Sequence, residues 1–263
     1  MRHRIRIASV SAITALLVLG GAAQAQAAPG PYTALGDSYS SGVGTRTYYA
    51  DSGSCYRGAK AFPVQVAARL GAQLTFAACS GARVPDVLNQ LGSLSASTAY
   101  VTVSVGGNDA GFADVITQCA LPWPWTCTGD ITNADNYIRS TLPGALDNLY
   151  TRISTRAPNA RVVVVGYPRL FNGEECNVGA RISRAEQTSL NATADLLSTT
   201  IAGRAAAHGF RFVDVRTPFT GHAVCDDVEW LNGLSSPVLE SYHPNAAGHT
   251  SGYTPLVASS LSA

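Results

Sequence analysis

The 263-residue chain carries little charge. Only 13% of its residues are Asp, Glu, Lys or Arg, and 18 basic side chains nearly balance 17 acidic ones, giving a net charge of +1. Globular domains typically contain about 25% charged residues, and nucleic-acid-binding proteins concentrate Lys and Arg on one face or segment. No run of basic residues is present, so we expect no nucleic-acid partner. Lys60 is the sole lysine, which leaves a single candidate for Schiff-base chemistry.

The motifs of several other enzyme classes are also missing. The sequence has no Gly-x-Ser-x-Gly, Ser-x-x-Lys or His-Glu-x-x-His, which argues against an α/β-hydrolase elbow, a β-lactamase-type serine and a zincin site. No cysteine pair has the short spacing of a zinc site. Asp226, Asp227 and Glu229 are better interpreted as a solvated acidic turn than as calcium ligands. We therefore expect no metal and no other cofactor.

The first 27 residues have the pattern of a secretory signal peptide. Three arginines precede an apolar run over residues 7–23, and the small-residue stretch 25–28 follows. We expect cleavage after Ala27, one folded domain over residues 28–263 and an extracellular location. A retained membrane anchor is the alternative, but the apolar run is short and interrupted by hydroxyl side chains.

Six cysteines in an exported chain predict three disulfides. Six cysteines allow 15 connectivities, and the sequence alone does not choose among them. Their order along the chain favours pairing of neighbours, namely Cys55 with Cys79, Cys119 with Cys127, and Cys176 with Cys225. Free buried thiols are the alternative.

Apolar, β-branched runs alternate with helical patterns along the chain. We predict strands at residues 32–35, 74–77, 100–105, 161–165 and 210–215, and helices at 62–70, 85–91, 110–119, 134–156 (interrupted at Pro143) and 183–208. Residues 162–165 are four valines in succession, as in a strand that is buried on both faces. The alternation predicts one three-layer α/β domain with a parallel sheet between helices. In such a sheet, ligands bind beyond the carboxyl ends of the strands.

Candidate catalytic side chains follow the predicted strands. Ser38 comes directly after the first strand, Gly81 after the second and Asn108 after the third. A serine hydroxyl can act as a nucleophile, and a backbone N–H with an asparagine amide can form an oxyanion hole. Each residue by itself is more typical of an ordinary loop than of a catalytic site. His243, fixed by a following proline, is the candidate general base, with His222 as its competitor.

Four blocks in this order carry a resemblance to a known family. They are Gly-Asp-Ser-Tyr-Ser-Ser-Gly at 36–42, Ala-Cys-Ser-Gly-Ala at 78–82, Gly-Gly-Asn-Asp-Ala-Gly at 106–111 and Ser-Tyr-His-Pro at 241–244. The sequence resembles the SGNH (GDSL) hydrolase superfamily, and within it the secreted lipases, esterases and phospholipases of actinobacteria. The resemblance implies a flavodoxin-like fold with a five-stranded parallel sheet between helices, and three disulfides are typical of that subgroup.

The resemblance also implies a role for each matching residue. Ser38 would be the nucleophile and His243 its general base, while the N–H groups of Ser38 and Gly81 and the amide of Asn108 would form the oxyanion hole. The superfamily's Asp three residues before the histidine is replaced here by Glu240. Either Glu240 or the backbone carbonyl of Ser241 would therefore orient the imidazole, and we favour the carbonyl.

The expected function is a secreted carboxylic ester hydrolase, a lipase or esterase that forms an acyl-enzyme and extends to phospholipids as substrates. A carbohydrate acetylesterase and a non-catalytic secreted binding protein are the alternatives. We expect a monomer that takes an acyl ester or lipid substrate and makes at most transient contact with a lipid surface. Trp123 and Trp125 lie between Cys119 and Cys127; we favour packing as the core of that small loop over exposure to acyl chains.

Overall fold

The computed structural model describes residues 30–122, 124–176, 179 and 181–263. The predicted signal peptide and Trp123 therefore lie outside the described residues. The strands are β1 (Tyr32–Gly36), β2 (Leu74–Phe76), β3 (Tyr100–Ser104), β4 (Arg161–Val165) and β5 (Arg211–Val213). The α-helices are α1 (Ser38–Ser41), α2 (Phe62–Leu70), α3 (Val84–Gln90), α4 (Phe112–Cys119), α5 (Thr128–Ser140), α6 (Leu142–Arg156), α7 (Arg184–Ala207) and α8 (Thr254–Ser262).

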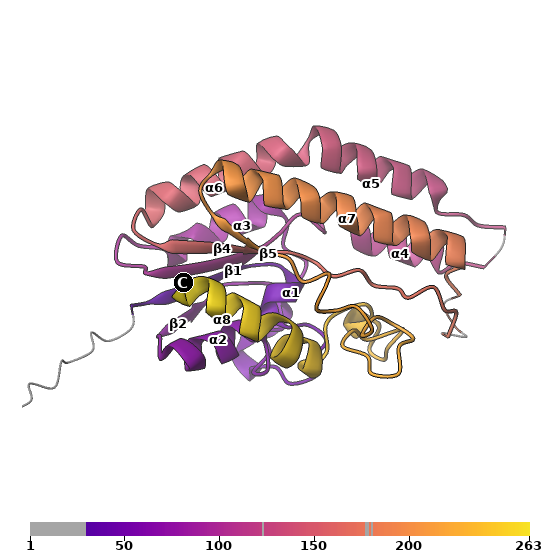
Figure 1. Cartoon of the computed structure of the whole chain (residues 1–263), viewed down its shortest axis with the longest axis horizontal. Coiled ribbons are helices and arrows are strands. Elements are labelled where there is room, and N and C mark those ends of the chain that lie inside the picture. The colour runs from indigo at the N-terminus through magenta and orange to yellow at the C-terminus, as the bar shows by residue number, and fades with distance from the viewer. Residues whose placement is uncertain (1–29, 123, 177–178, 180) are drawn as a thin grey trace, which may run out of the picture.

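The five strands form one parallel sheet in the order β2-β1-β3-β4-β5. This is the flavodoxin-like order, in which the strand sequence reverses direction beside β1. The predicted fold class is thus confirmed. In Figure 1 the chain enters β1 from one end of the molecule, so the carboxyl ends of the strands, α4 and the long segment before α8 lie toward the other end.

Helices cover both faces of the sheet, as parallel strands require. On one face, α3, α5, α6 and α7 pack over the side chains of Val162 and Val164; on the other, α2 and α8 pack over those of Val163 and Val165 (Figure 1). Consecutive valines of β4 therefore enter different cores, since successive side chains of a strand point to opposite faces. This explains why the run of four valines is continuously apolar.

The predicted helix bounds are most accurate where the sequence contains a recognisable capping residue. Ser183 caps α7 by accepting from the Glu186 N–H, and the Glu186 carboxylate accepts from the Ser183 N–H at 2.9 Å, which is a reciprocal capping box at the start of the helix predicted over residues 183–208. The prediction of one interrupted helix from residue 134 is wrong at its start. Helix α5 already begins at Thr128, and the break falls at Thr141.

The three disulfides join Cys55 to Cys79, Cys119 to Cys127 and Cys176 to Cys225, which is the sequential pairing. Cys79 lies in the loop after β2 that also contains Gly81, Cys119 is the last residue of α4, and Cys225 lies in the long segment between β5 and His243. They thereby restrain the loops in which the candidate site residues lie.

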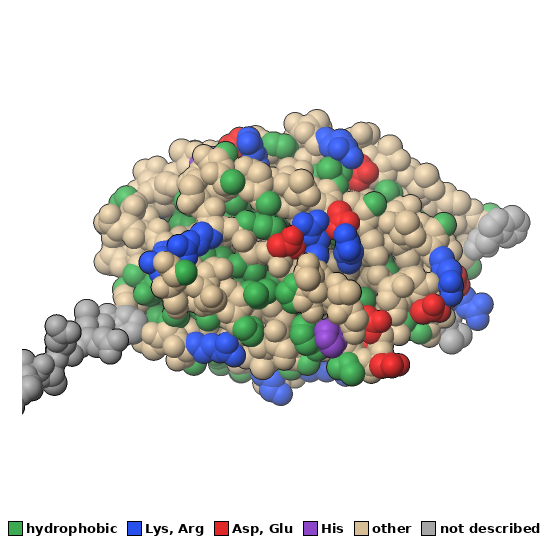
Figure 2. Space-filling model, viewed as in Figure 1, with side chains coloured by type: hydrophobic (Ala, Val, Ile, Leu, Met, Phe, Trp, Pro, Cys, Tyr) green, Lys and Arg blue, Asp and Glu red, His purple; other side chains and the backbone are tan. Residues whose placement is uncertain are grey.

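The surface is poor in charge, as the composition predicts. On the face shown in Figure 2, charged side chains are scattered among uncharged polar and hydrophobic ones, and no basic patch is visible. Among the described residues, every helix is too short or too polar to cross a membrane.

Candidate active site

Ser38 is the first residue of α1 and lies two residues after Gly36, the last residue of β1. Gly36 makes the turn possible, because its φ is 128° and a Cβ there would lie 2.5 Å from the Ser104 carbonyl oxygen. Asp37 caps the helix, accepting from the Tyr39 N–H at 3.0 Å. The Ser38 N–H, in the first turn, has no partner within the helix and is available to a ligand.

His243 faces Ser38 across the carboxyl edge of the sheet. Its Nε2 lies 2.8 Å from the Ser38 Oγ, and its Nδ1 lies 2.9 Å from the Ser241 carbonyl oxygen. A carbonyl oxygen only accepts, so the proton belongs on Nδ1 and Nε2 is left to accept from the serine. Burial lowers the pKa of His243 to about 4, although the hydrogen bond to the Ser241 carbonyl opposes that shift. The imidazole is therefore neutral at pH 7 and can act as a base.

The backbone around His243 is held by residues that the sequence analysis missed. Tyr242 has a φ of 59°, and its carbonyl accepts from the Tyr39 hydroxyl at 2.8 Å. Asn232 donates its N–H to the His243 carbonyl and accepts from the Tyr242 N–H, both at 2.9 Å. These bonds fix the left-handed turn that directs the Ser241 carbonyl at Nδ1. Only the position of Tyr39 within the first motif could have indicated its part.

Glu240 does not contact His243. Its buried carboxylate accepts from the Tyr48 hydroxyl at 2.5 Å and lies 3.9 Å from the Arg46 guanidinium. The Glu240 carbonyl also accepts from the Asn232 side-chain amide. Glu240 therefore joins the histidine segment to the loop over residues 44–48, and of the two orienting groups considered, the Ser241 carbonyl is the one in position.

Replacing Glu240 with alanine should therefore have a small effect on catalysis. Loss of a true ionic partner of the histidine costs about 10⁴-fold in a serine triad, whereas Glu240→Ala should retain more than about a tenth of wild-type kcat. The measurement is kcat on a soluble nitrophenyl ester, with Glu240→Gln as the isosteric control. A thousandfold or larger fall in kcat with the fold intact would contradict the assignment of the Ser241 carbonyl.

Asn108 and Gly81 lie on the loops after β3 and β2. The Asn108 side-chain amide donates one hydrogen to the Ala82 carbonyl at 3.0 Å and lines the same pocket as Ser38 and His243. Its second hydrogen remains available to a ligand, since an amide carries two. Gly81 adopts a φ of 76° between Ser80 and Ala82, whose own N–H groups bind backbone carbonyls.

Asp37 has a structural role. Its buried carboxylate accepts from the Tyr39 N–H, the Ser104 hydroxyl at 2.7 Å and the Tyr167 hydroxyl. Burial raises its pKa to about 6, an effect that these hydrogen bonds oppose. It makes no contact with His243 and serves to hold the turn that presents Ser38.

An apolar pocket of about 330 Å³ opens beside these groups. Ser38, Asn108 and His243 lie in its wall. The rest of the lining is mostly apolar and comes from α4 and from the segment before His243; its larger members are Phe112, Ile116, Leu234, Val238, Leu239 and Tyr242. A narrow polar site at the wall of an apolar pocket suits a substrate with one polar reacting group and an apolar chain.

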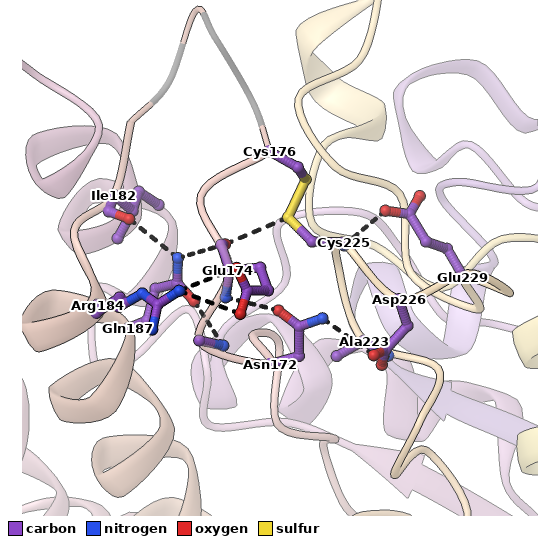
Figure 3. The surroundings of a disulfide bond; sticks show 11 residues. Asn172, Glu174, Cys176, Ile182, Arg184, Gln187, Ala223, Cys225, Asp226 and Glu229 are labelled. Carbon is purple, nitrogen blue, oxygen red and sulfur yellow. Dashed lines mark hydrogen bonds and ion pairs between the residues drawn. A yellow bond between two sulfur atoms is a disulfide. The ribbon is translucent and has the colours of Figure 1, made fainter.

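The remaining candidate residues are placed elsewhere. His222 stacks on Trp230 at 3.7 Å between ring centroids, and its Nδ1 lies 2.7 Å from the Val228 carbonyl oxygen, so it is not the base. In the acidic turn, Asp226 accepts from the Ala223 N–H and Glu229 from the Cys225 N–H, beside the Cys176–Cys225 disulfide (Figure 3). These carboxylates stabilise the turn.

Trp125 is 61% exposed, so for that residue the expectation of a packed loop core is wrong.

The pH dependence of catalysis should report the lowered pKa of His243. Because the imidazole stays neutral well below its ordinary pKa of 6.5, kcat/KM should remain high in mild acid and fall with a midpoint near pH 4. The free energy of unfolding should also decrease as the pH falls below 6.5. The His243 imidazole of the unfolded chain then binds a proton, whereas that of the native protein stays neutral until about pH 4.

The experiment is a series of initial rates after brief pH jumps, with circular dichroism at each pH to confirm the native fold. An acid limb near pH 6 that disappears in Asp37→Asn would assign the limb to Asp37 instead and contradict this prediction.

Comparisons with known proteins agree with this geometry. Residues 34–250 match the model of the GDSL-like lipase/acylhydrolase family. The chain is 51% identical to Lipase 1 of Streptomyces coelicolor over 247 residues, which is 91% of each chain. It resembles the crystal structure of the extracellular lipase of Streptomyces rimosus (46% identity, TM-score 0.84, covering 88% of this chain and 99% of that one). It also resembles phospholipase A1 of Streptomyces albidoflavus (45% identity, TM-score 0.85, covering 89% and 100%).

Proposed function

Because the chain belongs to the GDSL-like lipase/acylhydrolase family and is an ester hydrolase, we propose that it is a secreted lipase or esterase that works through a Ser38–His243 dyad. The observation that carries this proposal is the position of His243, with Nε2 at 2.8 Å from the Ser38 hydroxyl and Nδ1 on a backbone carbonyl. The alternative of a non-catalytic binding protein has no support from the relatives.

The proposed reaction has two steps. The Ser38 Oγ attacks the ester carbonyl carbon while its proton passes to the His243 Nε2, and the carbonyl oxygen becomes an oxyanion. As the intermediate collapses, His243 gives that proton to the leaving alcohol, and an acyl-Ser38 ester remains. Water then attacks the acyl group with the same transfer of a proton to and from Nε2, which releases the carboxylic acid and restores Ser38.

The oxyanion hole is assigned to three donors. They are the N–H groups of Ser38 and Gly81 and the side-chain amide of Asn108. The bond from Asn108 to the Ala82 carbonyl holds the amide in place before substrate binds, so that little reorganisation accompanies the reaction. The Ser241 carbonyl stabilises the imidazolium that forms, in the role that a carboxylate fills in a triad.

The apolar lining of the pocket favours fatty-acyl esters over acetylated sugars. A site for a polysaccharide needs polar partners for the sugar hydroxyls, because unpaired polar groups are costly to bury, whereas this pocket is lined mostly by aliphatic and aromatic side chains. The two similar crystal structures are a lipase and a phospholipase A1. We therefore assign the acyl chain of the substrate to this pocket.

Secretion is part of the proposal. The basic and apolar pattern of residues 1–27 supports export, and the lipase of Streptomyces rimosus is described as extracellular. Three disulfides fit an oxidising compartment.

Initial rates on nitrophenyl esters from acetyl to palmitoyl test the assignment of substrate. We expect kcat/KM to rise from acetyl toward medium or long chains, because each buried methylene adds about 0.8 kcal/mol of binding free energy. A matched assay on acetylated xylan is the control for the alternative. Cleavage of acetyl esters alone, together with release of acetate from the xylan, would replace this proposal with a carbohydrate acetylesterase.

A further inference from the structure

The mouth of the apolar pocket is bordered by exposed hydrophobic side chains. Leu234, Val238 and Leu239 belong to the pocket lining, yet they are 42%, 73% and 39% exposed. A side chain that both lines a pocket and faces solvent lies at the rim. A contiguous apolar patch that is exposed on a protein surface commonly marks a site of interaction with a ligand, a protein or a membrane.

Further exposed hydrophobic residues follow helix α4, which also lines the pocket. Helix α4 lines the pocket as far as Ala120, and the chain then places Leu121 (41% exposed) and Trp125 (61% exposed) in solvent. The Cys119–Cys127 disulfide closes this loop. Five of the eight large hydrophobic side chains that are exposed in the described part of the chain thus belong to these two segments. We call Leu121, Trp125, Leu234, Val238 and Leu239 the apolar rim.

The two segments that carry the apolar rim are free of charge. Residues 115–129 and 230–239 contain no Asp, Glu, Lys or Arg. A surface that binds anionic lipid headgroups uses clustered Lys and Arg, and these segments have none. The rim therefore suits an uncharged or zwitterionic lipid surface, into which leucine, valine and tryptophan side chains insert by the hydrophobic effect.

The segment 232–241 is held in shape by hydrogen bonds. The Ser235 N–H binds the Ser241 hydroxyl at 2.9 Å, and the Asn232 side chain binds the Glu240 carbonyl at 3.2 Å. The short helix Val238–Glu240 lies between these bonds. Val238 is thus presented to solvent by a preformed loop, and little conformational entropy is lost when it binds.

We propose that the apolar rim docks the protein onto the surface of a zwitterionic lipid assembly, so that an acyl chain passes from the lipid into the pocket without crossing bulk water. This inference rests on the proposed function and deepens it, because it makes aggregated lipid the preferred form of the substrate. The occupant is a lipid surface because Leu234, Val238 and Leu239 border the opening of the pocket assigned to the acyl chain, and Leu121 and Trp125 follow the helix that lines the same pocket.

Binding to phosphatidylcholine vesicles tests the proposal. The Ser38→Ala chain is mixed with sedimenting vesicles, which it cannot hydrolyse, and the bound fraction is measured at low and high salt. Trp125→Ser and Val238→Ser, each in the Ser38→Ala background, should reduce the partition coefficient about tenfold, the effect of keeping one large apolar side chain out of the lipid. The matched control is Val228→Ser, since Val228 is 59% exposed but lies outside both segments that carry the apolar rim.

Hydrolysis of a water-soluble nitrophenyl ester separates the two proposals. Trp125→Ser and Leu121→Ser, made in the active chain, should leave that rate unchanged and lower the rate on phosphatidylcholine vesicles. Wild-type vesicle binding by the Trp125 and Val238 variants, or binding that requires anionic lipid and is lost in high salt, would overturn docking by the apolar rim. Failure of the active chain to cleave any soluble ester would instead overturn the proposed function, whatever the vesicles show.

Discussion

Replacing Ser38 with alanine is expected to lower kcat on a soluble nitrophenyl ester by about 10⁴- to 10⁶-fold, as loss of the nucleophile does in serine hydrolases. The Oγ that we propose as the nucleophile is removed, and no other hydroxyl occupies its position 2.8 Å from the His243 Nε2 among the described residues. The variant should still fold, because the Ser38 hydroxyl contacts only this histidine and the Asp37 cap is retained.

Ser41→Ala is the matched control for this prediction. Ser41 lies on the same short helix, is also buried, and donates its hydroxyl to the Ser38 carbonyl rather than to the histidine. It should keep most of the activity. A Ser38→Ala chain that hydrolyses the ester at the wild-type rate would show that another residue is the nucleophile.

Replacing Asn108 with alanine is expected to lower kcat by about a hundred- to a thousandfold while KM changes little. The amide is assigned to the oxyanion, which exists only in the transition state and the intermediate, and loss of one such donor has an effect of this size. The hydrogen bond to the Ala82 carbonyl is lost as well, so the variant should also be less stable by about 1 kcal/mol.

Steady-state kinetics and thermal unfolding of the same preparation separate the two effects of Asn108→Ala. A fall in kcat with the fold intact at the assay temperature supports the assignment to the oxyanion hole. An unchanged kcat together with a lowered Tm would restrict Asn108 to its structural bond with Ala82.

The sequence predicts the fold closely where local signals and burial agree. The four valines of β4 and the capping box of α7 were recognisable because each depends on neighbouring residues alone. The start of α5 was not, because its first turn contains Thr128, Gly129 and Asp130, which favour a loop. Tertiary contacts stabilise the helix as a whole instead: α5 packs on α7, where the Thr193 hydroxyl donates to Asp135 at 2.8 Å, and a disulfide to Cys119 fixes Cys127 directly before the first turn.

In the candidate site, too, some residues could be identified from the sequence and others only from the structure. The proximity of Ser38, Asn108 and His243 was predictable because the three residues stand in recognisable motifs, and the structure places them around one pocket. The choice between Glu240 and the Ser241 carbonyl was not, because a backbone group is present at every residue and only the fold directs it at Nδ1. Asn232 supports His243 from 11 residues away through its backbone, which leaves no trace in its residue type.

Covalent labelling with a nitrophenyl alkylphosphonate tests the central claim most directly. The reagent phosphonylates an activated serine, and peptide mass spectrometry locates the adduct. The account predicts one adduct per chain, on Ser38, formed at nearly the wild-type rate in Glu240→Ala and greatly slowed in His243→Ala. An adduct on another residue, or labelling of Ser38 that depends on Glu240 and not on His243, would contradict a dyad oriented by the Ser241 carbonyl.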